Sequence, residues 1–473
     1  MKLIFLLILL FPFVTIFANE DNEGDDDEPF DISSTGIGTE DYDAKKFVDL
    51  VLAQKQDPEK LLKMFRAIFL KEYDHQHEET IKFFKPIISS ALNDYLPGQK
   101  QAIRSIELLV ENDKFQHIEK DVIKSMIQKF MFSDDISISI KTLETLAKII
   151  SKNPKFRDLA LSFNIDDKLF KYMNKKCTIR PEISPKIAAV IKSLCTFGDK
   201  KLPEKIITKL LWIIEYFLKE SKNPEIIKNS TWAYWFLTKP PTSRQYFILE
   251  EIVKNQIEFL EHEDFELKLV TLGVIEAIFE REKPDQTQMY LSNGFLSKLP
   301  KLLEENNDDL IIQEVLVIVG KLIKTSKETS EDSTTAIHEA EIPPNVVKNI
   351  FHEKFVIQDA ATLATCYIIS SSNEEQILNL IDANVVNGLC HFFKLTETED
   401  RYVFGVLEGL QKILKKAEKR VKEIYESLDE CEGIKVLERL KYRRNKSIGD
   451  QSEEILQVLE KAMQKEDQVK SEL

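Results

Sequence analysis

Glycine is scarce in this chain, with 13 in 473 residues, against an average usage of about 7%. The phosphate-binding patterns G-x-G-x-x-G and G-x-x-x-x-G-K-[ST] are both absent; such patterns need glycine because the backbone approaches the phosphate closely. The metalloprotease pattern H-E-x-x-H and the hydrolase pattern G-x-S-x-G are absent too. Because no acid, base and nucleophile set can be assembled, we expect no enzymatic activity and no cofactor.

Cysteine is also sparse. The cysteines are Cys177, Cys195, Cys366, Cys390 and Cys431. Their number is odd and they form no C-x-x-C pair, so we expect neither a disulfide framework nor a zinc site. This cysteine usage, taken alone, indicates a cytosolic protein. The histidines of the Asp74–Glu79 segment lie two positions apart, on different faces of a helix, which favours a solvated turn over a metal site.

Positive charge is in deficit, since 65 Lys and Arg face 80 Asp and Glu, a net charge of −15. This balance argues against nucleic acid as the partner, because phosphate binding needs clustered bases. Residues 19–43 contain no base at all, and we expect a disordered acidic tail over 19–46. The basic stretch at 435–446 is interleaved with Glu438 and apolar residues, which favours a solvated face over a nucleic-acid patch.

A single apolar run stands at the N-terminus. Lys2 is followed by the apolar run Leu3–Phe17 and then by Ala18, a small residue suited to cleavage. This order predicts a secretory signal peptide over 1–18; an uncleaved anchor and a wrongly assigned start are the alternatives. No other segment is apolar enough to suggest a membrane span. If the chain enters the secretory pathway, the sequons at Asn229 and Asn445 become possible glycosylation sites.

The rest of the chain is helical in pattern. From Lys45 onward, apolar residues recur every three or four positions, as at Val48, Val51 and Leu52. Three segments repeat one order of features, an apolar helix, a polar break and a short amphipathic helix: 143–161, 272–291 and 363–381. A spacing of roughly forty residues or a little more is typical of armadillo and HEAT repeats.

The repeats decide the predicted architecture. We predict an all-α fold, an armadillo-repeat right-handed α-solenoid superhelix, because each repeat buries its apolar face only against its neighbours. The array should cover 47–420, and a C-terminal helical cap and tail should cover 421–473. The Ser- and Thr-rich acidic stretch 325–341 is expected to be a disordered loop that could cover a groove.

Short motifs in a fixed order carry a resemblance. They are residues 156–159 (F-R-D-L), 192–195 (K-S-L-C), 231–238 (T-W-A-Y-W-F-L-T), 285–288 (D-Q-T-Q), 380–384 (L-I-D-A-N) and 430–433 (E-C-E-G). Over about residues 80–465 this order resembles importin-α, the armadillo-repeat receptor for nuclear localisation signals. The resemblance implies an extended cargo peptide in a concave groove, where Asn side chains bond its backbone and Trp rings hold the stems of its lysines.

The residues of that groove are almost all replaced here. The resemblance places the Asn positions at Glu107, Lys148, Ser193, Phe236, Ala277, Lys321, Cys366 and Lys412. It places the Trp positions at Ile103, Glu144, Ala189, Trp232, Gly273, Val317, Thr362 and Glu408. Only Trp232 matches. Three lysines in a groove that should attract lysines predict repulsion of a basic signal. Trp212 and Trp235 are expected in the core, whereas Trp232 fits either the core or the groove.

Two function hypotheses follow. One is a nuclear-import adaptor in cytoplasm and nucleus, as the resemblance implies; the other is an interaction scaffold in the secretory pathway or outside the cell. The family's basic N-terminal segment, which recruits importin-β, is replaced by the acidic tail, so importin-β binding is not expected. Both hypotheses predict a protein or an extended peptide as partner, with no nucleic acid, and no membrane beyond the signal peptide.

Overall fold

The computed structural model describes Leu62, Lys63, Arg66, Ile81, Lys82, Lys85, Ile88 and Leu92, and residues 96–472 without 115–116, 176–179, 197–201, 239–249, 281–283, 326–329 and 397–398. The predicted signal peptide, the acidic tail and the Asp74–Glu79 segment lie outside the described residues. Every regular element within the described ranges is helical, which confirms the predicted all-α class. None of these helices combines the length and the apolar character needed to cross a bilayer.

The chain divides into two compact units, Met1–Thr145 and Leu146–Leu473. The first unit holds α6 (Leu96–Glu111), α7 (Lys120–Ser125), the π-helix η3 (Met126–Phe130) and the start of α8 (Ile136–Lys152). The second unit carries the rest of the array. The range 421–473, expected to form a cap, is helical in its described part.

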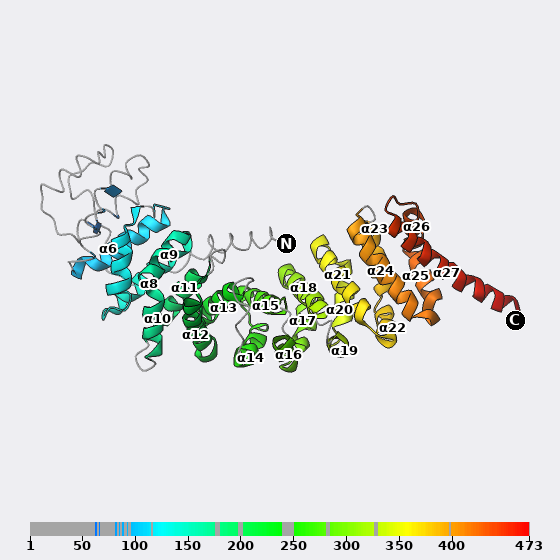
Figure 1. The fold of residues 1–473 in the computed structure, drawn as a ribbon, viewed down its shortest axis with the longest axis horizontal. Helices are drawn as coiled ribbons and strands as arrows, with labels where there is room; N and C mark the ends of the chain where they lie inside the picture. The colour runs from blue at the N-terminus through cyan, green and yellow to red at the C-terminus, as the bar shows by residue number, and fades with distance from the viewer. Residues whose placement is uncertain are drawn as a thin grey trace. The chain divides into compact units, whose positions relative to one another are not determined.

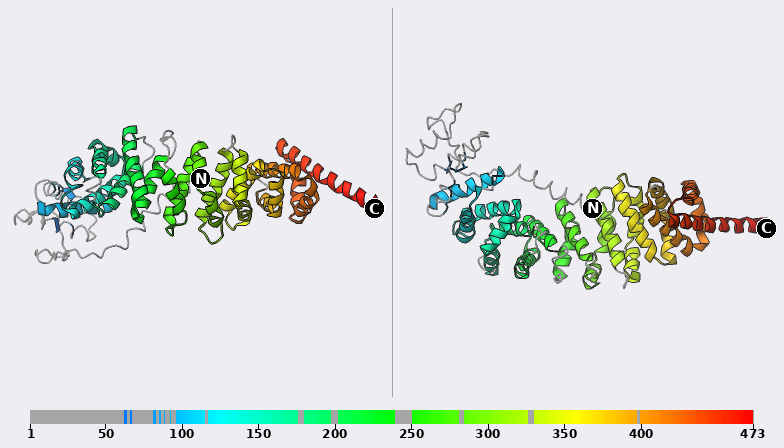
Figure 2. Two further views of the ribbon diagram at one scale, coloured as in Figure 1. Left: turned by 90° about the horizontal axis from the view of Figure 1, so that it is seen from below. Right: turned by 45° about the horizontal axis from the view of Figure 1, so that its top comes forward.

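The long helices of the second unit form a row in which each contacts the next (Figure 1). The row consists of α11 (Ser184–Cys195), α13 (Pro224–Thr238), α15 (Phe265–Phe279), α18 (Asp309–Thr325), α21 (Phe355–Ser371), α24 (Asp400–Lys416) and α27 (Lys446–Glu472). We call this row the helix ladder. Figure 2 shows the same succession of helices from two further directions.

Further helices pack beside the ladder and complete each repeat, as α12 does on α13 and α23 on α24. They are α9 (Pro154–Ser162), α10 (Ile165–Asn174), α12 (Glu204–Glu220), α14 (Glu250–Phe259), α16 (Pro284–Ser292), η5 (Leu296–Lys298), α17 (Leu299–Leu302), α19 (Ser330–Glu339), α20 (Ile342–Lys348), η6 (Asn349–Phe351), α22 (Glu374–Asp382), α23 (Val385–Thr396), η7 (Glu418–Arg420), α25 (Val421–Glu430) and α26 (Gly433–Leu440). This succession of short and long helices makes the unit an armadillo-like α-solenoid.

Local sequence sets the starts of these helices. Asn153 caps α9 by accepting a hydrogen bond from the Lys155 amide, and Pro154 fills the first helical position, where no amide hydrogen is needed. Asn373 and Gln376 form a reciprocal capping box on α22. Because such caps satisfy amides that have no partner inside the helix, the polar breaks between repeats also fix where each helix begins.

The core lies between neighbouring repeats. On α18, the side chains of Ile312, Val315, Leu316 and Val319 are fully buried, in the spacing of three and four that one helix face requires. Burying each such side chain contributes about 1.5–3 kcal/mol. Since each ladder helix packs between two others, the array has a continuous core.

The prediction of no disulfide framework is wrong for one pair of cysteines. Cys390 on α23 and Cys431, directly after α25, form a disulfide with their Cα atoms 6.4 Å apart. The sequence separation of 41 residues is about one repeat, so the solenoid brings two distant cysteines together without a C-x-x-C pattern. That coincidence with the repeat period was the signal available in the sequence.

The expected disordered loop over 325–341 is also wrong in its main part. Residues 330–339 form α19, and its Ile337 side chain is fully buried. The Ser- and Thr-rich sequence forms a helix because Ile337 and the neighbouring Ser333 and Thr334 pack into the repeat, so tertiary contacts outweigh the weak intrinsic helix propensity. The described part of this stretch is therefore a repeat helix rather than a cover for a groove.

Candidate functional site

The predicted groove residues fall on the long helices. In the second unit, Ser193 lies on α11, Trp232 and Phe236 on α13, Lys321 on α18 and Lys412 on α24. Lys148 lies on α8, and Glu107 lies on α6 in the first unit; both are partly buried. The ladder thus places the predicted positions of α11 to α24 along one row of helices, as the repeat register requires.

Trp232 is not available as an open slot for a lysine stem. Its side chain is only 6% exposed, and its Nε1 donates a hydrogen bond of 2.8 Å to Oε1 of Glu266 on α15. The ammonium of Lys192, from α11, lies 5.4 Å from the centre of the indole ring. Burial lowers the pKa of Lys192, against the opposing effect of Glu266. The cation that contacts this ring therefore comes from the chain itself.

A second tryptophan of α13, Trp235, fills the space against the neighbouring ladder helix α15. Trp235 is 2% exposed, which confirms it as a core residue. Its ring covers Gly273 on α15, and a Cβ at that position would lie 2.8 Å from the indole Nε1. Close approach of the indole thus requires glycine at this position, where the resemblance to importin-α places a Trp. Trp212 is only partly buried and stacks on Tyr216, so the core expectation is wrong for this residue.

The ladder lysines are paired with carboxylates. Lys321 lies 2.7 Å from Oε1 of Glu276 on the neighbouring α15 and also contacts Glu280, the residue that directly follows this helix. Burial lowers the pKa of Lys321, but these two glutamates outweigh it and raise the pKa. Lys412 contacts Glu408 at 2.6 Å and Ser370 of α21 at 2.8 Å. Carboxylates therefore compensate the charge of these two lysines, and repulsion of a basic signal stays a prediction.

Two further predicted positions offer little to a ligand. The hydroxyl of Ser193 is buried and donates to the Ala189 carbonyl of its own helix, at 3.0 Å. Phe236 is 7% exposed and packs on Trp232 with ring centres 5.9 Å apart. These side chains complete the packing of α11 and α13.

The C-terminal part of the ladder has a different surface. Leu363 on α21 is 54% exposed and Phe404 on α24 is 42% exposed. Gly405 follows Phe404, and a Cβ added there would meet nothing within 4 Å. The Cys366 thiol, about one turn after Leu363, donates to the Gly405 carbonyl at 3.4 Å, which places the two helices side by side at this point. We call Leu363, Phe404 and Gly405 the apolar step.

Polar and aromatic groups border the apolar step. The Tyr402 hydroxyl donates to Asp359 across the two helices at 3.5 Å, and the Arg401 guanidinium stacks on the Tyr402 ring at 4.2 Å. Burial raises the pKa of Asp359. Phe355 at the start of α21 lies against Tyr402 with ring centres 5.9 Å apart and is 42% exposed. The step therefore continues into a partly exposed aromatic cluster.

Burial raises the pKa of the Cys366 thiol to about 12 and also raises that of Cys195, so both thiols are protonated at neutral pH. Within the described ranges, no three His, Cys, Asp or Glu side chains are arranged to hold a metal ion. Neither of these two thiols has the lowered pKa that an activated nucleophile requires.

The two sequons lie in different environments. Asn229 is in α13 and only 9% exposed, whereas Asn445 is exposed and lies just before α27. The Asn445 amide donates to Asp400 at 2.9 Å. A glycan on Asn229 would be incompatible with the packing around α13, so Asn445 stays as the predicted glycosylation site.

No family model matches the chain, and the search of curated proteins finds no match. Among solved structures, the chain is similar to an engineered protein of the Northeast Structural Genomics Consortium, with 17% identity and a TM-score of 0.68 over 89% of this chain and 99% of that one. It also matches a designed armadillo repeat protein in complex with the peptide (KR)4, with 16% identity and a TM-score of 0.41 over 52% of this chain and 98% of that one. At these identities the first likeness shows the fold alone, and the second TM-score is too low to carry an argument.

Proposed function

We propose that this chain is a non-enzymatic scaffold whose helix ladder binds an extended polypeptide segment of a partner protein at the apolar step. The observation that carries the proposal is the exposure of Leu363 and Phe404, together with the open space at Gly405, on two helices that pack against each other. Exposed apolar surface on an otherwise well-buried array is typical of binding sites. An extended segment can place apolar side chains on the step while its backbone bonds with the polar border.

The proposed partner segment is apolar rather than rich in Lys and Arg. The positions where the resemblance to importin-α places Asn hold none here. Lys321 and Lys412 already form ion pairs with Glu276 and Glu408, so these carboxylates are not free to bind a basic peptide. Each missing amide removes hydrogen bonds worth roughly 0.5–1.5 kcal/mol, and several together lower affinity by orders of magnitude. Nuclear import, the finer function that the resemblance implies, is therefore the less favoured candidate.

We further propose that the scaffold works in the secretory pathway or outside the cell. The Cys390–Cys431 disulfide supports this compartment, because such bonds persist in oxidising environments. The predicted signal peptide at 1–18 and the exposed sequon at Asn445 point the same way. A C-terminally tagged chain should lose its leader near Ala18 and show a glycosidase-sensitive mass shift that Asn445→Gln removes. An intact Met1 with diffuse cytosolic and nuclear signal would restore the import candidate.

The binding proposal is tested by selecting peptides from a displayed random library on the full chain. Selected peptides should lose about tenfold or more in affinity for Leu363→Asp, since a buried charge opposes apolar contact. Leu395→Asp is the matched control, because Leu395 is also 54% exposed but lies on α23 outside the ladder. Equal losses for both variants, or for neither, would refute the apolar step as the binding site.

The same assay tests the import candidate. A labelled Lys/Arg-rich localisation peptide should show no measurable change in fluorescence anisotropy with the full chain. Micromolar binding that Trp232→Ala abolishes would show that the remaining tryptophan position still holds a basic signal.

A further inference from the structure

A small cavity lies away from the apolar step and is lined by residues that directly follow α14, by α15 and by the segment that runs from η5 past α17. It has a volume of about 110 Å³, which is room for several waters or for one tetrahedral oxyanion. Leu260 and Leu302, both almost fully buried, line it on the apolar side. Its polar lining includes three lysines, Lys268, Lys298 and Lys301.

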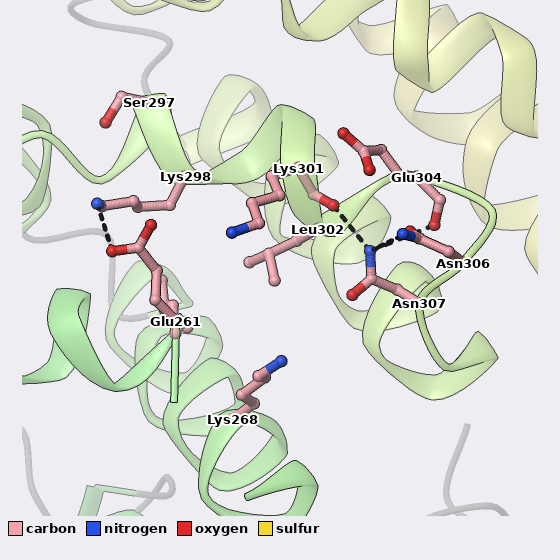
Figure 3. A pocket seen from close by; sticks show the side chains of 10 residues that line it. Glu261, Lys268, Ser297, Lys298, Lys301, Leu302, Glu304, Asn306 and Asn307 are labelled. Carbon is pink, nitrogen blue, oxygen red and sulfur yellow. Dashed lines mark hydrogen bonds and ion pairs between the residues drawn. The ribbon is translucent and has the colours of Figure 1, made fainter. Parts of the chain in front are cut away.

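The three lysines are not equivalent. Lys298 pairs with Glu261 at 2.7 Å, and this contact, helped by Lys301, lowers the pKa of Glu261. Neither Lys268 nor Lys301 has a carboxylate within ion-pair distance among the residues that the structure describes. Lys268 extends from the first turns of α15 and Lys301 from α17, toward the space beside Leu302 (Figure 3). Lys268 and Lys301 therefore line the cavity from different helices without an ion pair of their own, and the carboxylates of Glu261 and Glu304 line it as well.

Hydrogen bonds of the Asn307 side chain fix one side of the cavity. The Asn307 side-chain amide donates to the Lys301 carbonyl at 2.7 Å and to the Glu304 carbonyl at 3.3 Å. These bonds hold the turn between α17 and α18 against the helix that carries Lys301. A fixed turn keeps the Lys301 stem near the cavity, so less side-chain freedom is lost when an anion binds.

We propose that this cavity is a binding site for a phosphate group. A phosphate dianion matches the two unpartnered ammonium groups in charge, and its oxygens accept charge-assisted hydrogen bonds from lysine. The shared chemistry has two sources, free inorganic phosphate or a phosphorylated serine side chain of a partner protein. In a chain with a net charge of −15, a local excess of positive charge is the feature that draws an anion to this place. The site does not depend on the function proposed for the apolar step.

Substitution of Glu261 tests the proposal, because the affinity for phosphate should increase rather than decrease. Because Glu261 occupies Lys298, Glu261→Gln should free a third ammonium and tighten phosphate binding by about threefold or more, as expected when a competing carboxylate is removed. A cavity in which the lysines serve only solubility would show no gain. This variant removes a partly exposed pair and leaves the buried leucines intact, so folding is preserved.

The experiment is calorimetric titration of the full chain with inorganic phosphate at low ionic strength, where screening is weak. The double variant Lys268→Gln/Lys301→Gln should bind about tenfold or more weakly. Lys254→Gln is the control, since Lys254 is exposed on α14, pairs with Glu250 and does not line the cavity. Circular dichroism and thermal melts check that each variant is folded.

A second arm identifies the source of the phosphate. A short phosphoserine peptide is compared with inorganic phosphate and with its unphosphorylated form; tighter binding of the phosphopeptide supports a partner side chain, and a preference for inorganic phosphate supports the free ion. The proposal is overturned if the wild type binds no phosphate at millimolar concentration. It is also overturned if the double variant binds as the wild type does, or if Glu261→Gln does not tighten binding.

Discussion

The helix ladder is closed at its centre and open toward its C-terminal end. Around α13 and α15, Trp235 fills the space over Gly273, and Trp232 is occupied by Glu266 and Lys192. Around α21 and α24, the space over Gly405 is empty and Leu363 is more than half exposed. Two glycines in equivalent long helices thus serve opposite purposes. Gly273 permits packing inside the chain, whereas Gly405 leaves surface for another molecule.

This difference shows why a retained residue type is a poor guide to a retained site. Trp232 is the position that matches the importin-α pattern, yet its ring and its Nε1 are both engaged by the chain itself. The apolar step lies instead on α21 and α24, two and three ladder helices beyond α15, at positions that the pattern did not single out. The binding capacity of a solenoid is set by which side chains its own packing leaves unengaged.

The largest expected difference in stability between the two regions comes from truncating one aromatic side chain in each. Trp235→Ala should destabilise the chain by about 3–5 kcal/mol, because it removes a buried indole and leaves a cavity. Phe404→Ala, on the open part of the ladder, should cost about 0.5 kcal/mol or less, as is usual for surface substitutions. Urea unfolding followed by circular dichroism measures both. Similar costs for the two variants would contradict the contrast between a closed and an open region.

The disulfide distinguishes the C-terminal region from the centre. Cys390→Ala should destabilise the region around α23 to α26 by about 2–4 kcal/mol, since the bond closes a loop of 41 residues. Hydrogen exchange should accelerate there and not in α13 or α15. The control is reduction of the Cys390→Ala variant, which should change nothing further. Uniform acceleration over the whole second unit would show that the repeats unfold as one.

Alanine substitutions at Gly273 and Gly405 should change the stability of the chain in opposite directions. Gly273→Ala should destabilise by about 1–3 kcal/mol, because its Cβ would meet the Trp235 indole at 2.8 Å. Gly405→Ala should stabilise by about 0.5–1 kcal/mol, since alanine is the better helix former and its Cβ meets nothing. Thermal melts of the two variants measure the shifts. A loss of stability for Gly405→Ala would mean that the apolar step is filled.

The smallest effect concerns the ion pair of Lys321. The raised pKa of Lys321 means that the pair contributes fully below the ordinary lysine value of 10.5 and is lost as the pH rises through the raised pKa. Its side chain is 21% exposed, so about 1 kcal/mol or less is expected. Unfolding midpoints of wild type and Lys321→Met should differ near neutral pH and converge in strongly alkaline solution. A difference that persists there would exclude the ion pair as its cause.

The sequence predicted the helical class and the repeats well, because apolar periodicity and polar breaks act locally. The short helices α9 and α22 begin after Asn153 and Asn373, which lie in the polar breaks of the repeat pattern. It predicted α19 poorly, since burial of Ile337 is a tertiary effect. The Cys390–Cys431 bond and the pairing of Lys321 with Glu276 were missed for one reason. Both join residues about one repeat apart, 41 and 45 positions, which only the stacking of the solenoid brings into contact.

The most direct test of the account is site-specific photo-crosslinking of a selected peptide. A benzophenone side chain replaces either Phe404 on α24 or Phe265 at the start of α15, two phenylalanines that are 42% and 41% exposed. Because the two side chains are almost equally exposed, a difference in crosslinking reports the location of the peptide and not the accessibility of the probe. We expect a crosslink to the peptide at position 404 and none at position 265. A crosslink confined to position 265, or equal yields at both, would contradict the claim that the open, C-terminal part of the ladder is where a partner binds.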